Sequence, residues 1–400
     1  MESFQSSELV QRLTESVTLS FAKKARELKD AGAEVISLAL GEPDFDTPDF
    51  IKEALKKAID ENHSHYTPIS GYNSLRDAVC EKFKRDNNIH YKRENIVVST
   101  GAKQCIFNVM LSVLNPSDEL LIIAPYWVSY RQIADLTQCD IKEVCGKIEN
   151  DFKISPQELE SSLTSKTKMV IFSSPSNPSG AIYTKKELEE FAEVFNKFPN
   201  AYIVADEIYE HIHYAEKPFS IASIPSMLER VITINGLSKG FAMTGYRLGY
   251  MAAPVAIANA CTKLQGQVTS GTNAITQQAA ITALKADPSV VKSFVASFKQ
   301  RRDLMLSLLK DIPGMECNVP EGAFYVFAKI EAYKMKKFRG EQFEDSLALC
   351  TSFLEHFLVA LVPGEAFGAP WHVRLSYASS ENDIREACKR IKEAFASMED

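Results

Sequence analysis

Ala201-Tyr-Ile-Val-Ala-Asp206 and Val231-Ile-Thr-Ile-Asn235 are short apolar runs that each stop at a polar residue. Four further runs of this kind, separated by helix-like segments, lie at residues 96–99, 119–124, 168–172 and 247–251. Short continuous apolar runs are typical of strands that are covered on both faces, because neither face meets water. The alternation of strands and helices therefore predicts an α/β fold with a mainly parallel sheet.

The composition is that of a globular protein. The 400 residues are 45% hydrophobic and 24% charged, which excludes disordered, collagen-like and coiled-coil chains. A chain of this length suits two domains or one elaborated α/β unit. We expect a helix over residues 9–31 and a long helical region over about residues 255–286. Because strand–helix alternation gives way to longer helices after Pro254, we expect a large domain over residues 45–290. A smaller α+β domain would combine residues 1–44 with residues 291–400.

Charge and cysteine content exclude several further classes. The net charge of −7 gives no basic surface for nucleic acid or an anionic membrane. No apolar run approaches the roughly 20 residues that span a bilayer, and the polar N-terminus lacks the pattern of a secretory signal. The eight cysteines include no CxxC pair and have no accompanying histidine cluster, so we expect reduced thiols and no zinc site. These features predict a cytoplasmic protein.

Polar residues follow the ends of the expected strands. In open α/β sheets, ligands bind outside the carboxyl ends of the strands. Phosphate-binding, stacking, hydrogen-bonding, acidic and amine groups therefore meet at one rim, at Gly101-Ala102-Lys103, Tyr126-Trp127, Asn177, Asp206 with Tyr209, and Ser238-Lys239.

Three of these positions suggest specific chemistry. Gly101 between a strand and a helix is either a structural turn or an anion site at the helix N-terminus; it is not part of a GxGxxG or GxxxxGK[ST] loop. Lys239 is either a solvated surface lysine or a nucleophilic amine, and Arg247, eight residues on, suits a phosphate. Asp206 could be a metal ligand, a helix cap or a counter-ion. The absence of companion metal ligands favours a counter-ion to a buried cationic ring nitrogen.

The motifs resemble those of the fold-type I pyridoxal-phosphate (PLP) aminotransferases, in the bacterial aspartate aminotransferase-like branch. The resemblance implies a large, mainly parallel seven-stranded sheet domain, a smaller α+β domain and an enzyme dependent on PLP. The matching stretches run in family order from about residue 15 to residue 380. They are Gly41-Glu-Pro-Asp-Phe-Asp-Thr-Pro48, Tyr66-Thr-Pro-x-x-Gly71, Gly101-Ala-Lys103, Pro125-Tyr-Trp127, Ser174-Pro-Ser-Asn-Pro-Ser-Gly180, Asp206-Glu-Ile-Tyr209, Ser238-Lys239 with Gly245-Tyr-Arg247-Leu-Gly249, and Val373-Arg374-Leu-Ser-Tyr377.

The resemblance implies roles for the residues around the cofactor ring. Lys239 would bind PLP covalently and, once freed, move the proton between the substrate Cα and the cofactor. Asp206 would keep the pyridine nitrogen protonated. Tyr209 and Asn177 would hydrogen-bond the phenolate oxygen, and Trp127 would stack on the ring. The alternative for Trp127 is a core aromatic.

The resemblance also implies how the phosphate is held. Arg247, Ser238 and the helix start at Gly101-Ala102 would bind it. Tyr66 resembles the tyrosine that reaches the phosphate from the neighbouring subunit. The expected assembly is therefore a homodimer with shared active sites.

Substrate choice follows from a further set of residues. Arg374 would clamp the substrate α-carboxylate, helped by the backbone near Gly41. Lys103 with Ser16 and Thr18 resembles a site for a distal carboxylate, which implies aspartate, glutamate and their 2-oxo acids in a ping-pong Schiff-base reaction. For Lys103 a phosphate or surface role stays open, and for Ser16 and Thr18 a plain polar role.

Several alternatives share these motifs. The same residues would serve prephenate or aromatic transamination, β-elimination or ring-forming lyase chemistry. A binding or regulatory protein on this fold would have no use for Lys239. Pro370-Trp-His372 departs from the family pattern, and the loop from Ala366 to Pro370 could alter side-chain preference; His372 has no assigned role.

Overall fold

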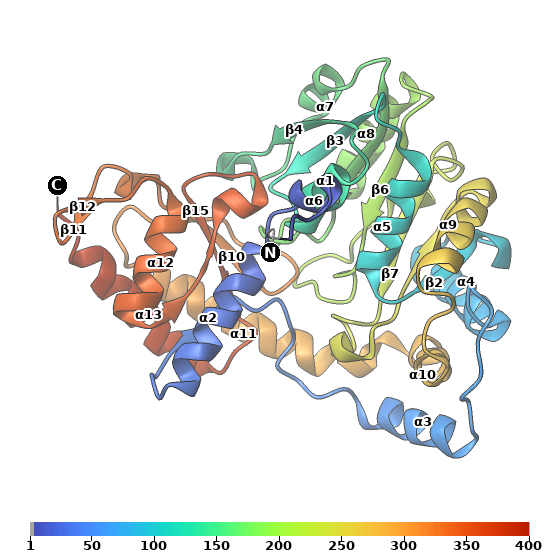
Figure 1. The fold of residues 1–400 in the computed structure, drawn as a ribbon, viewed down its shortest axis with the longest axis horizontal. Coiled ribbons are helices and arrows are strands. Elements are labelled where there is room, and N and C mark those ends of the chain that lie inside the picture. Colours follow the sequence, from blue (N-terminus) through green and yellow to red (C-terminus); the bar gives the residue numbers. More distant parts are fainter. Residues whose placement is uncertain (1–3, 400) are drawn as a thin grey trace.

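A seven-stranded sheet forms the centre of the larger of two lobes in the computed structural model, which describes residues 4–399 (Figure 1). One strand, β8, runs antiparallel to both of its neighbours, and the other neighbouring pairs are parallel. The predicted mainly parallel α/β sheet is therefore confirmed. Its order is β2 (Ile96–Ser99), β8 (Gly249–Ala252), β7 (Val231–Gly236), β6 (Tyr202–Asp206), β5 (Thr167–Ser173), β3 (Glu119–Ala124) and β4 (Asp140–Cys145).

Both faces of this sheet are buried, as the continuous apolar runs require. In β6, Val204 belongs to a core with α5 (Ala102–Val113) and α9 (Val255–Val268), whereas Ile203 and Ala205 belong to the core on the other face. Helix α6 (Ser129–Asp135) lies on the first face. The second face is covered by α3 (Asp49–Asp60), α4 (Asn73–Asn87), α7 (Pro156–Ser162), α8 (Lys185–Asn196) and α10 (Ala274–Lys285).

The smaller lobe is α+β. Its antiparallel sheet has the order β14 (Val362–Pro363), β15 (His372–Ser376), β10 (Tyr325–Lys329) and β9 (Glu316–Cys317). The accompanying helices are α2 (Val17–Asp30), α11 (Lys292–Leu309), α12 (Ser346–Phe357) and α13 (Glu381–Ala396) (Figure 1). Small pairs are formed by β1 (Ile36–Ser37) with β13 (Val359–Ala360) and by β11 (Lys337–Phe338) with β12 (Glu341–Gln342).

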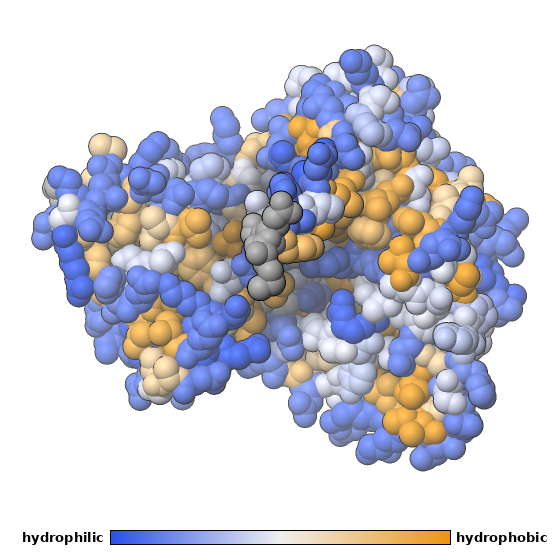
Figure 2. Space-filling view, in the orientation of Figure 1, coloured by the Kyte–Doolittle hydropathy of each residue, from blue (hydrophilic) through white to orange (hydrophobic). Residues whose placement is uncertain are grey.

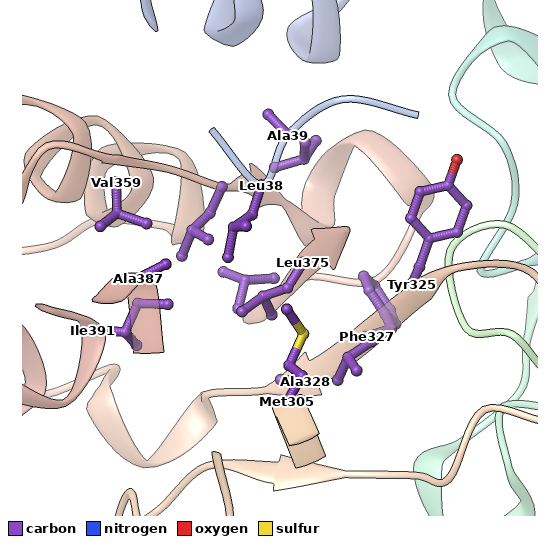
Figure 3. Close-up of a cluster of buried hydrophobic side chains, with 14 of the residues drawn as sticks. Leu38, Ala39, Met305, Tyr325, Phe327, Ala328, Val359, Leu375, Ala387 and Ile391 are labelled. Carbon is purple, nitrogen blue, oxygen red and sulfur yellow. The ribbon is translucent and has the colours of Figure 1, made fainter. Parts of the chain in front are cut away.

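The core of the smaller lobe joins segments from both ends of the chain. Leu38 packs with Met305, Phe327, Leu375 and Ile391 (Figure 3). Apolar burial thus holds the N-terminal segment against elements more than 250 residues away. The domain boundaries at residues 45 and 290 stay a prediction.

Two expected helices differ in the structure, and one strand of the large sheet was not expected. The helix expected over residues 9–31 is split into α1 (Glu8–Gln11) and α2, and the intervening Thr14 N–H donates to Gln132 Oε1 on α6 at 2.9 Å. The long helix expected after Pro254 ends at Val268 and restarts as α10, capped by the Asn273 side chain. Strand β4 was not expected, because its residues are exposed or half-buried at the sheet edge and form no continuous apolar run.

Within residues 4–399, no helix combines the length and the apolar character needed to cross a bilayer.

Candidate active site

A cavity of about 340 Å³ lies between the two lobes, at the carboxyl ends of the parallel strands. The face drawn in Figure 2 is hollowed between the lobes. The structure brings most of the predicted site residues into this cavity: Ser16, Thr18, Gly41, Ala102, Lys103, Trp127, Asn177, Asp206, Tyr209, Ser238, Lys239, Arg247 and Arg374. Gly101 lies directly behind the wall, against Arg247. Tyr66 is fully exposed and does not line the cavity of its own chain.

Lys239 lies just past the end of β7 and faces the cavity. Its Nζ donates to the carbonyl oxygen of Gly41 at 2.6 Å. Burial lowers the pKa of Lys239 to about 8, with Arg374 and Arg247 acting in the same direction and Glu42 opposing them. At a pKa of about 8, roughly a tenth of this amine is uncharged at pH 7, and the uncharged form is the one that acts as a nucleophile.

Asp206 ends β6, and only 4% of its surface is exposed. Burial raises the pKa of Asp206 to about 6, against the opposing effect of hydrogen bonds from Tyr130 and from the Ile208 N–H. Tyr130 Oη donates to Oδ2 at 2.6 Å, and Ile208 N–H donates to Oδ1 at 3.2 Å. A carboxylate in this setting is strongly stabilised by a nearby cation.

Three groups meet at the start of α5. Gly101 has a φ of +87°, and a Cβ at this position would meet Arg247 Nη2 at 2.6 Å, so a side chain there would strain the backbone and displace the guanidinium. No side chain caps the helix, and its first turn holds no acidic residue. Arg247 Nη1 donates to the Thr244 carbonyl at 2.8 Å, and Ser238 lies on the same cavity wall. Free helix N–H groups, a guanidinium and a hydroxyl suit a phosphate dianion.

Arg374 is buried and lacks an acidic partner among residues 4–399. Its Nη1 donates to Asn177 Oδ1 at 3.0 Å and its Nη2 to the Ala39 carbonyl at 2.7 Å. The Nε atom is buried without a hydrogen-bond partner. The guanidinium lies 4.4 Å from the centre of the Tyr325 ring. A carboxylate in the cavity would supply the missing negative charge, which is the usual partner of a buried arginine.

Aromatic side chains form two other parts of the wall. Tyr209 and Tyr325 share a hydrogen bond of 2.7 Å between their hydroxyls, and Figure 3 shows the Tyr325 hydroxyl directed away from the apolar cluster. Burial, followed by the effect of Tyr325, raises the pKa of Tyr209. On another wall, Lys103 Nζ lies 5.0 Å from the Trp127 ring centre.

Lys103 is open to solvent in the cleft, and the structure shows no ion pair for it within the described residues. Burial by the cleft walls, and then the charge of Arg247, lower the pKa of Lys103. Ser16 and Thr18 lie on the same cavity, and the Thr18 hydroxyl oxygen is buried without a partner. This region can therefore accept a second anionic group.

His372 does not line this cavity. Its ring stacks on Phe327 with centres 5.0 Å apart, and its Nδ1 lies 2.8 Å from the Pro370 carbonyl oxygen. In the loop from Ala366 to Pro370, Ala366 lines a neighbouring cavity of about 400 Å³.

Sequence reasoning missed Tyr130, Ser173 and Tyr325 as cavity residues. Tyr130 follows Trp127 by three residues, one helical turn, but this spacing alone does not reveal its partner Asp206. Tyr325 lies in the apolar run Ala-Phe-Tyr-Val-Phe at residues 323–327, where nothing in the sequence distinguishes it from a core residue. No group of three or more His, Cys, Asp or Glu residues among residues 4–399 could hold a metal.

A parallel sheet with a lysine, an aspartate and an anion-binding helix start at its carboxyl edge defines a class of cofactor-dependent enzymes that act on amino groups. The chain belongs to the class I and II aminotransferase family, whose model matches residues 33–391. It is an aminotransferase, and enzymes of this family depend on PLP.

Known aminotransferases are similar to this chain over nearly its whole length. A probable aspartate/prephenate aminotransferase of Rickettsia felis is 45% identical over 387 residues, covering 96% of this chain and 94% of that protein. The crystal structure of the aspartate aminotransferase from Rhizobium meliloti has a TM-score of 0.95 and 37% identity, over 99% of this chain and 100% of that one. The Thermus thermophilus aspartate aminotransferase with maleate has a TM-score of 0.91 and 36% identity, over 98% and 100%. The fold class expected from the sequence is thereby confirmed.

The residues present fit PLP. Gly101 leaves room for Arg247 at the uncapped start of α5, as a phosphate requires. The buried carboxylate of Asp206, with its raised pKa, suits a cationic ring nitrogen. The Lys239 amine, partly uncharged near neutral pH, faces the same cavity.

Proposed function

We propose that this aminotransferase transfers the amino group of aspartate to 2-oxoglutarate, giving oxaloacetate and glutamate, with PLP as cofactor. The observation that carries the proposal is a pair of cationic side chains in one cavity, Arg374 and Lys103, neither of which is ion-paired with another described residue. Two separate cations match the two carboxylates of a dicarboxylic amino acid.

The cofactor would be held by groups at both ends of the cavity. Arg247, Ser238 and the amides at the start of α5 would bind the phosphate, and Asp206 would accept a hydrogen bond from the ring nitrogen. Trp127 would stack on the ring. When bound, PLP supplies the electron sink that makes loss of the substrate α-proton feasible.

Lys239 is the base in this proposal. Its Nζ would hold the cofactor and, once released, would accept the proton from the substrate Cα and later give it back. Tyr209 and Asn177 would donate hydrogen bonds to the phenolate oxygen and so help to set the basicity of the nitrogen that joins Lys239 to the cofactor.

Arg374 orients the substrate. Its guanidinium binds the α-carboxylate and so fixes which bond of Cα faces Lys239. Asn177 and the Ala39 carbonyl hold the guanidinium from the other side, and the backbone at Gly41 borders the same space. Lys103, with Ser16 and Thr18, binds the distal carboxylate.

The test is a panel of amino donors with 2-oxoglutarate as acceptor. Aspartate should give glutamate at a higher kcat/KM than phenylalanine or alanine, and cystathionine should give no pyruvate. No detectable glutamate from aspartate would refute the proposal, since every other part of it depends on this reaction.

Prephenate is the second candidate acceptor. The Rickettsia felis relative is named a probable aspartate/prephenate aminotransferase, and prephenate also carries two carboxylates. Amino transfer from aspartate or glutamate to prephenate would support it, whereas a rate no higher than with a neutral aromatic 2-oxo acid would exclude it.

The active enzyme is further proposed to be a homodimer in which Tyr66 completes the partner's phosphate site. The full exposure of this side chain supports the proposal. Two variants test it: Tyr66→Phe should bind PLP weakly, and Lys239→Ala should be inactive. Mixed dimers of the two should regain one intact site per dimer; no recovery on mixing would place Tyr66 outside the partner's site.

A further inference from the structure

The buried hydroxyl of Tyr130 has no function in the reaction described so far. Tyr130 is fully buried in α6, and its ring meets Trp127 edge to face, with centres 5.7 Å apart. Its Oη donates to Asp206 Oδ2 at 2.6 Å. Trp127, which lines the cavity, and Tyr130, which hydrogen-bonds Asp206, are thus only three residues apart in the chain.

The Tyr130 hydroxyl is the donor in its hydrogen bond with Asp206. The Ser173 side chain, at the end of β5, also hydrogen-bonds the Tyr130 hydroxyl and acts to lower its pKa. Burial, and then the charge of Asp206, raise the pKa of Tyr130 well above its usual range, so the hydroxyl keeps its proton. Tyr130 is therefore a permanent donor to Asp206.

The two oxygens of Asp206 are held by different segments. Oδ1 accepts from the Ile208 N–H within the following turn, and Oδ2 accepts from α6. With both oxygens fixed, the plane of the carboxylate is set, and each oxygen retains a lone pair for a further donor from the cavity. A single donor would leave the carboxylate free to turn about its χ2 angle.

We propose that Tyr130 is a positioning residue, whose hydroxyl keeps Asp206 ionised and turned so that it accepts a hydrogen bond from the ring nitrogen of PLP. The inference rests on the proposed cofactor. Tyr130 would therefore affect only the hydrogen bond between Asp206 and the ring nitrogen of PLP.

The groups that face Asp206 define its expected pH response. Besides Tyr130 they are Lys239, Tyr209, Glu207 and Cys105. Burial raises the pKa of Asp206 to about 6, and the hydrogen bond from Tyr130 opposes that rise. Removing the hydroxyl should raise the pKa of Asp206 further. At pH 6.5 a larger fraction of the carboxyl is then protonated in Tyr130→Phe than in the wild-type protein, and this difference shrinks at pH 8.5.

The experiment compares two cofactors with two proteins. Dissociation constants of PLP and of its 1-deaza analogue, in which carbon replaces the ring nitrogen, are measured by equilibrium dialysis for the wild-type protein and for Tyr130→Phe. At pH 6.5 the variant should bind PLP about tenfold more weakly, because a hydrogen bond to a charged group is lost. The loss should shrink at pH 8.5. The deaza analogue should bind both proteins within twofold of each other.

Tyr183→Phe is the matched control. It removes another buried tyrosine hydroxyl, which accepts from the Ile154 N–H at 3.1 Å outside the cavity. It should leave both dissociation constants unchanged, and thermal unfolding of both variants measures the general cost of losing a hydroxyl.

An equal loss for PLP and the deaza analogue, or no loss for either, would overturn the role of Tyr130. Failure of the wild-type protein to bind PLP at all would instead refute the proposed cofactor.

Discussion

Lys82 and Glu210 form a buried ion pair behind the active site, and breaking it should destabilise the protein strongly. The two side chains are 1% and 3% exposed. Glu210 also accepts from Asn87 Nδ2 at 2.7 Å and from Asn235 Nδ2 at 2.8 Å. One carboxylate therefore joins α4 to the turn that follows Asp206 and to the end of β7.

The magnitude follows from the pKa of Glu210. Burial acts to raise it, but Lys82, His211 and Asn87 outweigh burial and lower the pKa from 4.5 to about 2. At 1.36 kcal/mol per pKa unit, the native environment favours the ionised form by about 3 kcal/mol. Removing Lys82 leaves the buried Glu210 carboxylate without its cationic partner. Breaking a buried ion pair in this way typically destabilises a protein by about 3–5 kcal/mol.

We therefore expect Lys82→Met to lower the free energy of unfolding by about 3–5 kcal/mol at pH 7. The assay is urea denaturation, with the free energy taken from the midpoint and slope. Lys197→Met is the matched control, because Lys197 pairs with Glu160 at 2.8 Å while both side chains are about half exposed. That loss should be below about 1 kcal/mol.

The pH dependence gives an independent check. Because the folded pKa of Glu210 is below its unfolded value, its contribution is fully present above pH 4.5 and is lost as the pH falls towards 2. The free energy of unfolding of the wild-type protein should therefore fall, relative to that of the double variant Lys82→Met/Glu210→Gln, as the pH is lowered from 4.5 towards 2. A cost for Lys82→Met no larger than that for Lys197→Met would refute the reasoning.

The other predictions concern the cavity. Lys103→Met should reduce kcat/KM for aspartate by about 5- to 30-fold while sparing alanine, since an exposed charge-assisted contact contributes about 1–2 kcal/mol; equal losses in steady-state assays would make Lys103 a phosphate or structural residue. Arg374→Ala should lower kcat/KM for aspartate and alanine by similar factors, on the order of 100-fold or more, because the lost contact is common to both; a loss confined to aspartate would contradict this. Lys239→Ala should leave no protein-bound cofactor after borohydride reduction and denaturation, measured by mass spectrometry, and a retained adduct would point to another lysine. Gly101→Ala should weaken PLP binding by at least tenfold in equilibrium dialysis, because the new Cβ would meet Arg247 Nη2 at 2.6 Å; unchanged affinity would contradict the phosphate assignment.

The order of polar residues along the chain was sufficient to place the site. Each apolar strand is followed by a residue of distinct chemistry, and parallel strands must end at the same edge, so Asp206 and Lys239 were expected together. The structure has both on one cavity. Strand β4 escaped prediction because it lies at the sheet edge and lacks a continuous apolar run.

Pairings between distant residues required the tertiary structure. Lys82 is part of a helix rich in charged residues, where nothing local distinguishes it from a solvated lysine; only the packing of α4 against the turn after β6 buries it with Glu210. Tyr130 and Asp206 are 76 residues apart, and Arg374 and Asn177 are 197 apart.

The sequence by itself indicated most strands of the large sheet, the edge at which they end and which polar residues stand there, because local patterns of polarity dictate these. The tertiary structure alone decided which oxygen of Asp206 meets which donor, which nitrogen of Arg374 is left free and which lysine is buried. Those outcomes depend on contacts between segments that the chain order does not bring together.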